Sequence, residues 1–284
     1  MKKLLLGNEA IARGAYEAGV RVSSAYPGTP STEINENVAT YPEIYSEWAP
    51  NEKVAVEVAL GAAVSGARSL ACMKHVGLNV AADPFFTATY TGVNAGMVVV
   101  VADDPGMHSS QNEQDTRMLA RASHAPVLDP SNSQECKDFL KLAYEISEKY
   151  DTPVILRVTT RIAHARTLVE LDERVEVPLR EYKRDIKKYV SMPANMIARH
   201  LYVEEREKKL AEDANTLPIN RIEWADRKIG VITSGAAYNY VKEAMPTASV
   251  LKLGLAYPMP RKLIEEFAAG VDTLYVIEDM EPFY

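Results

Sequence analysis

The sequence predicts an α/β protein built on a parallel sheet, and three observations lead to that prediction. Strand-like apolar runs alternate with helix-like segments along most of the chain, which is typical of a sheet covered by helices on both faces. Residues 96–101, G-M-V-V-V-V, have the composition of a fully buried strand. The 284 residues are 47% hydrophobic and 25% charged, so the chain is long and apolar enough for about two domains with buried cores.

The first predicted domain covers residues 1–171. Its expected strands are residues 4–6, 20–25, a strand that ends before Pro50, 68–73, 96–101, 126–128 and 153–158. Its expected helices are residues 8–17, a helix with Pro30 as its first residue, an apolar helix that starts at Pro50 and Asn51, and residues 75–90, 114–121 and 133–149.

The chain changes composition after this domain. Residues 172–227 mix charges and contain few apolar side chains, so we expect a charged linker with a solvated helix and no site. Residues 228–284 predict a smaller α/β domain, similar to an incomplete three-strand parallel unit that ends directly after its third strand. Its expected strands and helices are 228–234, 236–244, 249–253, 261–269 and 273–278, with Gly235 at a strand-to-helix turn.

Charge and motifs exclude several classes of function. A net charge of -7 gives no reason to expect nucleic acid or an anionic membrane as a partner. No apolar run is long enough to span a bilayer and no signal peptide is evident, so we expect a cytoplasmic protein. Cys72 and Cys136 are far apart and form no C-x-x-C motif, so the chain alone builds neither a disulfide framework nor an iron-sulfur site. Nucleotide, hydrolase and zinc motifs are also missing.

The apolar helix after Asn51 carries an unusual carboxylate. Glu52 lies in its opening turn and shares a face with Val56 and two alanines further along the helix, and an unpaired buried charge is costly. Glu57 is the rival carboxylate, but it points about 140° away and follows Lys53 by four residues, which predicts an ion pair. Glu52 is therefore the leading candidate for chemistry.

Two loops could bind a ligand. In Y-P-G-T-P-S-T-E-I, residues 26–34, the Thr29 and Ser31 hydroxyls can face a carboxylate or phosphate, although a simple helix start explains the motif as well. The loop after the most apolar strand, residues 101–115, is dense in polar side chains at the expected carboxyl end of the sheet. His108 and Gln111 are its best candidates, and a solvated loop is the alternative.

Five segments together resemble a known family. They are L-L-L-G-N-E-A-I-A-R-G-A-Y-E-A-G-V, Y-P-G-T-P-S-T-E-I, M-K-H-V-G-L-N-V-A-A-D-P, V-V-A-D-D-P-G-M-H-S-S-Q-N-E-Q-D and D-T-P-V-I-L-R-V-T-T-R. They are similar to the alpha subunits of indolepyruvate:ferredoxin oxidoreductases, which belong to the thiamine-diphosphate-dependent 2-oxoacid:ferredoxin oxidoreductases. The resemblance extends through V-I-T-S-G-A-A-Y-N-Y and Y-V-I-E-D-M-E-P-F in the second unit.

The resemblance implies a pyrimidine-binding domain followed by a transketolase C-terminal-like domain. It implies that Glu52 hydrogen-bonds the pyrimidine ring nitrogen of thiamine diphosphate and thereby promotes loss of the thiazolium proton. Thr29 would contact the substrate or the reactive end of the cofactor, and Gly77 is also expected to contact the cofactor. Substrate would be an aryl pyruvate, bound with help from Ser31, His108 and Gln111, with coenzyme A and ferredoxin as further partners.

The chain departs from the family pattern at two points. Pyruvate-specific relatives have an arginine after the most apolar strand, where this chain has Asp103 and Asp104, so its carboxylate clamp must differ. The chain has no diphosphate and metal motif and no cluster cysteines, so magnesium and the 4Fe-4S clusters are expected in a missing region or a beta subunit, within a homodimer or hetero-oligomer. Another 2-oxoacid:ferredoxin oxidoreductase, a non-oxidative thiamine-dependent decarboxylase and a non-catalytic binding or scaffold protein of the same fold remain the alternatives.

Overall fold

The computed structural model describes residues 1–284 and contains a seven-stranded sheet at its centre. The strand order is β12-β6-β7-β5-β4-β2-β3, and every neighbouring pair is parallel except β12 with β6. The strands are β2 (Val22–Ala25), β3 (Tyr45–Trp48), β4 (Ser69–Lys74), β5 (Met97–Asp103), β6 (Val127–Leu128), β7 (Val154–Thr159) and β12 (Leu255–Tyr257).

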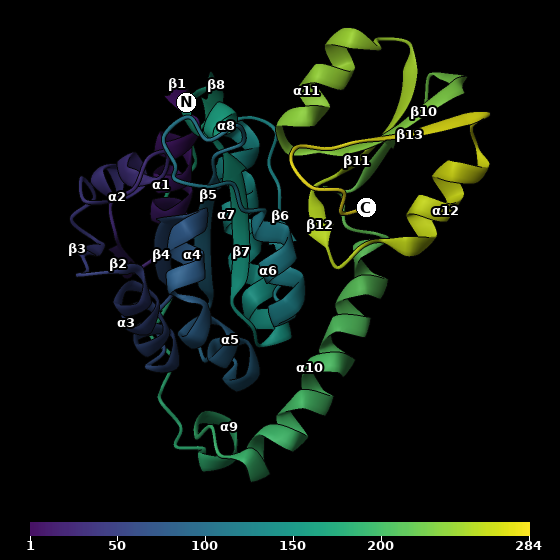
Figure 1. Ribbon diagram of the computed structural model, residues 1–284. Coiled ribbons are helices and arrows are strands. Elements are labelled where there is room, and N and C mark those ends of the chain that lie inside the picture. Colours follow the sequence, from purple (N-terminus) through teal and green to yellow (C-terminus); the bar gives the residue numbers. More distant parts are fainter.

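Helices cover both faces of this sheet (Figure 1). One face packs against α1 (Gly7–Glu17), α2 (Thr32–Val38) and α7 (Ser133–Tyr150). The other packs against α3 (Glu52–Val64), α4 (His75–Val80), α5 (Ala82–Thr91) and α6 (Thr116–Ser123). Strands β4, β5 and β7 are buried along their whole length, as expected of strands covered on both faces. The predicted α/β class with a parallel sheet is confirmed.

A second sheet forms in the last third of the chain, in the order β13-β10-β11-β9. It consists of β9 (Arg221–Glu223), β10 (Asp226–Ser234), β11 (Ala248–Leu253) and β13 (Thr273–Ile277), with helices α11 (Gly235–Ala244) and α12 (Arg261–Ala269). The predicted three parallel strands are present, but two further strands of this region were not predicted. Strand β9 adds an antiparallel edge, and β12 joins the main sheet instead of this one.

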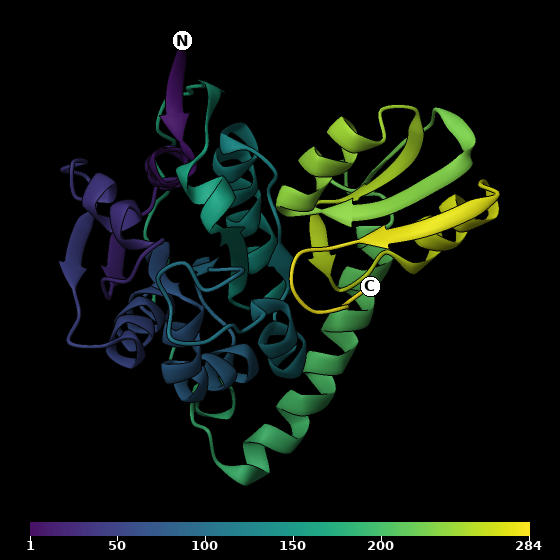
Figure 2. The ribbon, with the colours of Figure 1, turned by 45° about the horizontal axis from the view of Figure 1, so that its top comes forward.

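The segment between the two sheets, residues 172–220, packs against the first unit and is hydrogen-bonded to it. Residues 172–185 contain no helix or strand, and their backbone hydrogen-bonds the first unit at Glu17 and Gly66. Helix α9 (Ile186–Tyr189) follows, and then α10 (Pro193–Ala214) runs along the outside of the molecule to the second sheet (Figure 2). The expectation of a solvated helix is wrong for one side of α10, where four side chains are buried: Val203, Arg206, Leu210 and Ala214.

Two predicted helices differ in detail. Residues 75–90 form two helices, α4 and α5, because Pro84 lacks the N–H that a continuous helix would need and instead occupies the first turn of α5. Pro30 is not the first helical residue, because Ser31 closes a turn onto the Gly28 carbonyl and α2 begins at Thr32.

The remaining elements are short. Strand β1 (Lys2–Leu6) pairs antiparallel with β8 (Arg166–Glu170) in a separate two-stranded sheet, and α8 (Thr160–His164) follows β7. No helix is both long and apolar enough to cross a membrane. The division into 1–171, 172–227 and 228–284 stays a prediction, since β12 places residues of the last segment in the sheet of the first.

Candidate functional site

The loops after β2, β4 and β5 meet the start of α3 around a pocket of about 530 Å³. Parallel strands present their carboxyl ends at one edge of the sheet, which explains why loops distant in sequence converge there. The pocket is lined by Tyr26, Pro27, Gly28, Thr29, Glu52, Lys74, Val76, Asn79, Val80, Ser109, Gln111, Asn112 and Gln114. Three of the predicted site residues, Glu52, Thr29 and Gln111, are therefore brought together.

Glu52 is held at the first position of α3. The side chain of Asn51 caps this helix by accepting a hydrogen bond from the Val54 N–H at 3.0 Å. Glu52 is only 8% exposed, yet its carboxylate makes no hydrogen bond and no ion pair with any other residue. Glu57 is exposed, and Lys53 pairs with Asp83 at 3.2 Å, so the expected Lys53–Glu57 pair is wrong.

Gly77 lies behind the Glu52 side chain and does not line the pocket. A Cβ atom added to Gly77 would lie 2.7 Å from both Cγ and Oε1 of Glu52, closer than van der Waals contact allows. Only a glycine leaves this space for the carboxylate. Gly77 therefore makes room for the Glu52 side chain. It does not line the pocket, so its predicted contact with the cofactor stays a prediction.

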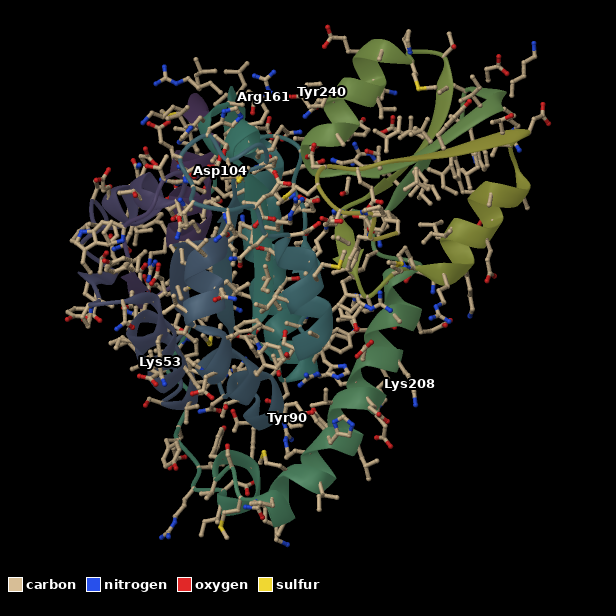
Figure 3. The ribbon with its side chains drawn as sticks, in the orientation of Figure 1. Lys53, Tyr90, Asp104, Arg161, Lys208 and Tyr240 are labelled. Carbon is tan, nitrogen blue, oxygen red and sulfur yellow. The ribbon has the colours of Figure 1, made fainter.

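The other predicted side chains lie in different environments. Thr29 and Gln111 are exposed at the pocket, and neither side chain has a hydrogen-bond partner in the protein. Ser31 is 2% exposed, donates its hydroxyl to the Gly28 carbonyl at 2.7 Å and does not line the pocket, so its ligand contact stays a prediction that this arrangement does not favour. His108 lines a second pocket of about 510 Å³, between the two units, with Arg161 and Tyr240. Figure 3 labels that pair, joined by a hydrogen bond of 2.9 Å.

Asp104 organises the loop that follows β5. Its carboxylate accepts hydrogen bonds of 2.8 Å from the Ser109 N–H, the Ser110 hydroxyl and the Thr160 hydroxyl. Burial alone would raise the pKa of Asp104, but these hydrogen bonds outweigh it and lower the pKa to about 2. The carboxylate is fully buried and therefore supports the loop from within, near the top of the sheet in Figure 3.

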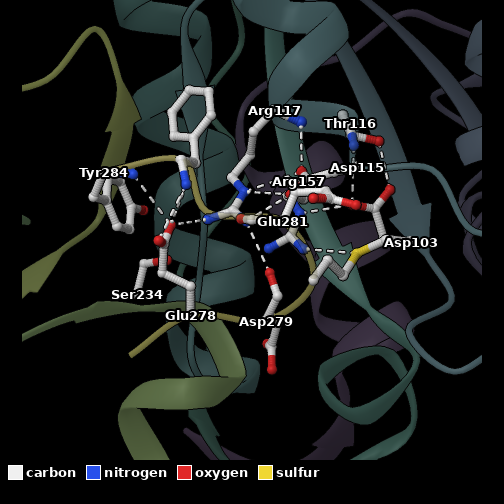
Figure 4. Close-up of polar contacts among 12 residues, drawn as sticks. Asp103, Asp115, Thr116, Arg117, Arg157, Ser234, Glu278, Asp279, Glu281 and Tyr284 are labelled. Carbon is white, nitrogen blue, oxygen red and sulfur yellow. Dashed lines mark hydrogen bonds and ion pairs between the residues drawn. The ribbon is translucent and has the colours of Figure 1, made fainter. Parts of the chain in front are cut away.

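Asp103 belongs to a buried network of charges. It accepts hydrogen bonds from Arg157 at 2.7 Å and from the Thr116 hydroxyl at 2.5 Å, and Arg157 also pairs with Asp129 at 3.1 Å. Figure 4 shows this network beside a second one centred on Arg117. Asp103 and Asp104 are thus both used within the protein, and neither lines the pocket.

Sequence reasoning missed Lys74, the last residue of β4. Lys74 is 8% exposed and lines the pocket with Glu52 and Thr29. A lysine directly after the apolar run S-L-A-C-M was a usable signal, since this position is at the carboxyl end of a central strand.

Comparison with known proteins places this pocket in a family. Residues 13–220 match the family model described as pyruvate flavodoxin/ferredoxin oxidoreductase, thiamine diphosphate-binding. The chain belongs to this family. The matched range includes every residue that lines the Glu52 pocket.

Curated relatives of this thiamine diphosphate-binding family include indolepyruvate oxidoreductase subunits. IorA of Pyrococcus horikoshii is 47% identical over 99% of this chain and 46% of its own length. IorA of Methanothermobacter thermautotrophicus is 46% identical, over 99% of this chain and 47% of its own length. The chain therefore spans about half the length of these relatives. The 2-oxoglutarate synthase subunit KorA of the same organism is 31% identical over 60% of this chain.

A solved structure has the same fold. The 2-oxoglutarate:ferredoxin oxidoreductase from Magnetococcus marinus, with 2-oxoglutarate, coenzyme A and succinyl-CoA bound, matches 97% of this chain and 57% of its own chain with a TM-score of 0.81. At 20% identity this likeness concerns the fold alone.

Proposed function

We propose that the chain is the pyrimidine-binding half of a thiamine-diphosphate-dependent oxidoreductase that converts an aryl pyruvate and coenzyme A to an acyl-CoA. Ferredoxin accepts the electrons in this proposal. The family match and the IorA relatives support the cofactor and the class of substrate. The observation that carries the proposal is the unpartnered, buried carboxylate of Glu52 in the pocket at the carboxyl ends of the strands.

The residues present fit the pyrimidine end of the cofactor. The Glu52 side chain is 8% exposed and its carboxylate, which has no partner in the protein, opens onto the pocket, so it is available to a ligand that donates a hydrogen bond to it. When bound, thiamine diphosphate supplies the carbon nucleophile that attacks the 2-oxo group. In this proposal the Glu52 carboxyl group would hydrogen-bond the pyrimidine ring nitrogen and pass a proton to or from it, and Gly77 leaves room for the Glu52 side chain.

Other pocket residues serve the substrate side in this proposal. The free hydroxyl of Thr29 and the free amide of Gln111 face the pocket and can donate hydrogen bonds to an oxygen of the 2-oxo acid. His108 lies in the neighbouring pocket, so its predicted substrate contact would require the loop after β5 to move. The buried carboxylate of Asp104 anchors that loop from below.

The rest of the active site is assigned to other polypeptide in this proposal. The diphosphate, magnesium and 4Fe-4S clusters would bind in further sequence or in a beta subunit, and the site would be complete only in a homodimer or hetero-oligomer. The half-length match to the IorA relatives is consistent with this division. Titration of the chain alone with thiamine diphosphate and magnesium is therefore expected to show weak binding or none.

The test is Glu52→Gln in the complete oxidoreductase, with Glu57→Gln as the matched control on the same helix. Loss of a general acid/base typically costs about 100-fold or more in rate. We expect at least that loss in kcat/KM for Glu52→Gln, measured as reduction of a viologen dye by an aryl pyruvate and coenzyme A. Glu57 is exposed, so its variant should retain wild-type rates. Equal activity of the two variants would refute the proposal.

A further inference from the structure

Lys74 is a buried ammonium without an acidic partner. It is 8% exposed, and its only hydrogen bond in the protein is the one that Nζ donates to the Ser109 carbonyl at 3.0 Å. An ammonium has three donors, so two remain for a ligand. No carboxylate forms an ion pair with Lys74, including Glu52 in the same pocket.

The other buried lysines are different. Lys137 is 1% exposed and pairs with Glu17 at 3.1 Å and with Asp172 at 2.9 Å. Lys252 is 0% exposed and pairs with Glu135. Burying a cation costs free energy unless an anion compensates for it. Lys74 is the one buried lysine for which this chain supplies no such anion, and it is the one that lines the pocket.

The position of Lys74 is set by two loops. Its aliphatic stem lies against Gly28, where an added Cβ would be 2.9 Å from Cδ of Lys74. Its ammonium is held by the Ser109 carbonyl, and the Ser109 hydroxyl in turn donates to the Thr29 carbonyl at 3.3 Å. Lys74, Ser109 and Thr29 all line the same pocket, so the cation and the Thr29 hydroxyl can reach the same ligand.

The acidic groups of the neighbouring loop do not compete for this cation. Asp104 is buried and uses both carboxylate oxygens on hydroxyl and N–H groups of its own surroundings. Asp103 is paired with Arg157 below the loop. The pocket therefore combines one unpaired carboxylate, at Glu52, with one unpaired cation, at Lys74, and the two do not neutralise each other.

We infer that Lys74 binds the carboxylate of the 2-oxo acid, which makes it a substrate-binding residue. This inference rests on the proposed function, because it takes the 2-oxo acid as the ligand. A hydrogen bond between ammonium and carboxylate is charge-assisted and is roughly twice as strong as a neutral one. The two free donors of Lys74 and the hydroxyl of Thr29 can together bind the carboxylate and orient the neighbouring 2-oxo group.

The first experiment measures steady-state kinetics of the complete oxidoreductase with an aryl pyruvate. Loss of a charge-assisted hydrogen bond predicts a rise in KM of about 10- to 100-fold for Lys74→Gln, with a smaller effect on kcat. Lys53→Gln is the matched control, because Lys53, labelled in Figure 3, is a surface lysine paired with Asp83 outside the pocket. Its KM should stay within about twofold of wild type. An unchanged KM in Lys74→Gln would overturn the inference.

The second experiment measures binding without turnover. Phenyllactate has the carboxylate of the substrate and cannot be decarboxylated by the same route, whereas its amide has the same shape without the charge. We expect wild type to bind phenyllactate at least about 10-fold more tightly than the amide by calorimetry, and Lys74→Gln to bind both equally. Equal binding of both compounds to wild type, or a preference retained in Lys74→Gln, would contradict the inference.

The two sites can be judged separately. If Glu52→Gln abolishes turnover while Lys74→Gln leaves KM and the analogue preference unchanged, only the inference about Lys74 fails. If Glu52→Gln retains full activity, the proposed function fails, and the analogue comparison still reports whether Lys74 recognises a carboxylate. Should Lys74→Gln not fold, Lys74→Met keeps the apolar stem against Gly28 and serves the same test.

Discussion

Arg117 joins helix α6 to the end of the chain, and its removal should destabilise the protein severely. Its guanidinium is 1% exposed and pairs with Asp115 at 2.6 Å and with Glu278 at 2.8 Å. It also donates to the carbonyls of Asp279 at 2.8 Å and Glu281 at 2.9 Å (Figure 4). Arg117→Met would keep the apolar stem but would leave the carboxylates of Asp115 and Glu278 without their cationic partner and the two carbonyls without this donor, although backbone N–H groups still donate to both carboxylates.

The magnitude follows from these contacts. Removal of one partner of a buried ion pair costs about 3–5 kcal/mol, because the remaining charge is left uncompensated. We therefore expect the free energy of unfolding of Arg117→Met to fall by about 3–5 kcal/mol. The two lost carbonyl contacts belong to the same network, so their contributions are not simply added to this figure. Urea denaturation followed by far-ultraviolet circular dichroism would measure it.

Arg121→Met is the matched control on the same helix. Arg121 is exposed in the last turn of α6 and forms no ion pair, so its replacement should change the free energy of unfolding by less than about 0.5 kcal/mol. A loss below about 1 kcal/mol for Arg117→Met, or equal losses for the two variants, would refute the reasoning from buried charge.

Two further predictions concern Asp104 and Gly77, which lie next to the pocket without lining it. The folded pKa of Asp104 is about 2, below its usual 3.8, so its stabilising effect is complete above about pH 4 and is lost as the pH falls toward 2. Acid titration of stability should therefore be less steep in this window for Asp104→Asn than for wild type, and identical slopes would argue against it. Gly77→Ala would place a methyl group 2.7 Å from the Glu52 carboxylate. The same methyl group would lie 2.9 Å from Cβ of the buried Met73, so we expect Gly77→Ala to lower kcat/KM at least about 10-fold and also to lower the melting temperature, and wild-type kinetics would refute the claim that Gly77 positions Glu52.

Local composition was enough to predict most strands and helices of the first unit, but not β8, β9, β12 or α8, and it singled out Glu52 as the catalytic candidate. Helical periodicity alone separated Glu52, which is buried, from Glu57, which is exposed. The same reasoning was wrong about Lys53, whose partner Asp83 comes from another helix. Residue spacing within one helix cannot predict that a carboxylate from another helix will compete for the same lysine.

Features that depend on distant segments could not be predicted. The burial of Lys74 depends on loops that contribute Gly28 and Ser109, and the Arg117–Glu278 pair joins residues 161 positions apart. The Ser31 hydroxyl could have bound either a ligand or the backbone of its own turn, and in the structure it donates to the Gly28 carbonyl. Sequence patterns identify polar groups, whereas packing decides which of them stay unpartnered.

The pairing of β12 with β6 means that the main sheet is completed only late in synthesis. During synthesis the edge strand β6 leaves the ribosome long before its antiparallel neighbour, since Leu128 pairs with Leu255. At typical elongation rates of about 5–20 residues per second, β6 waits on the order of ten seconds with an open edge. Until then the nascent chain offers that edge to any other strand, so chaperone binding in this interval is expected to favour correct completion of the sheet.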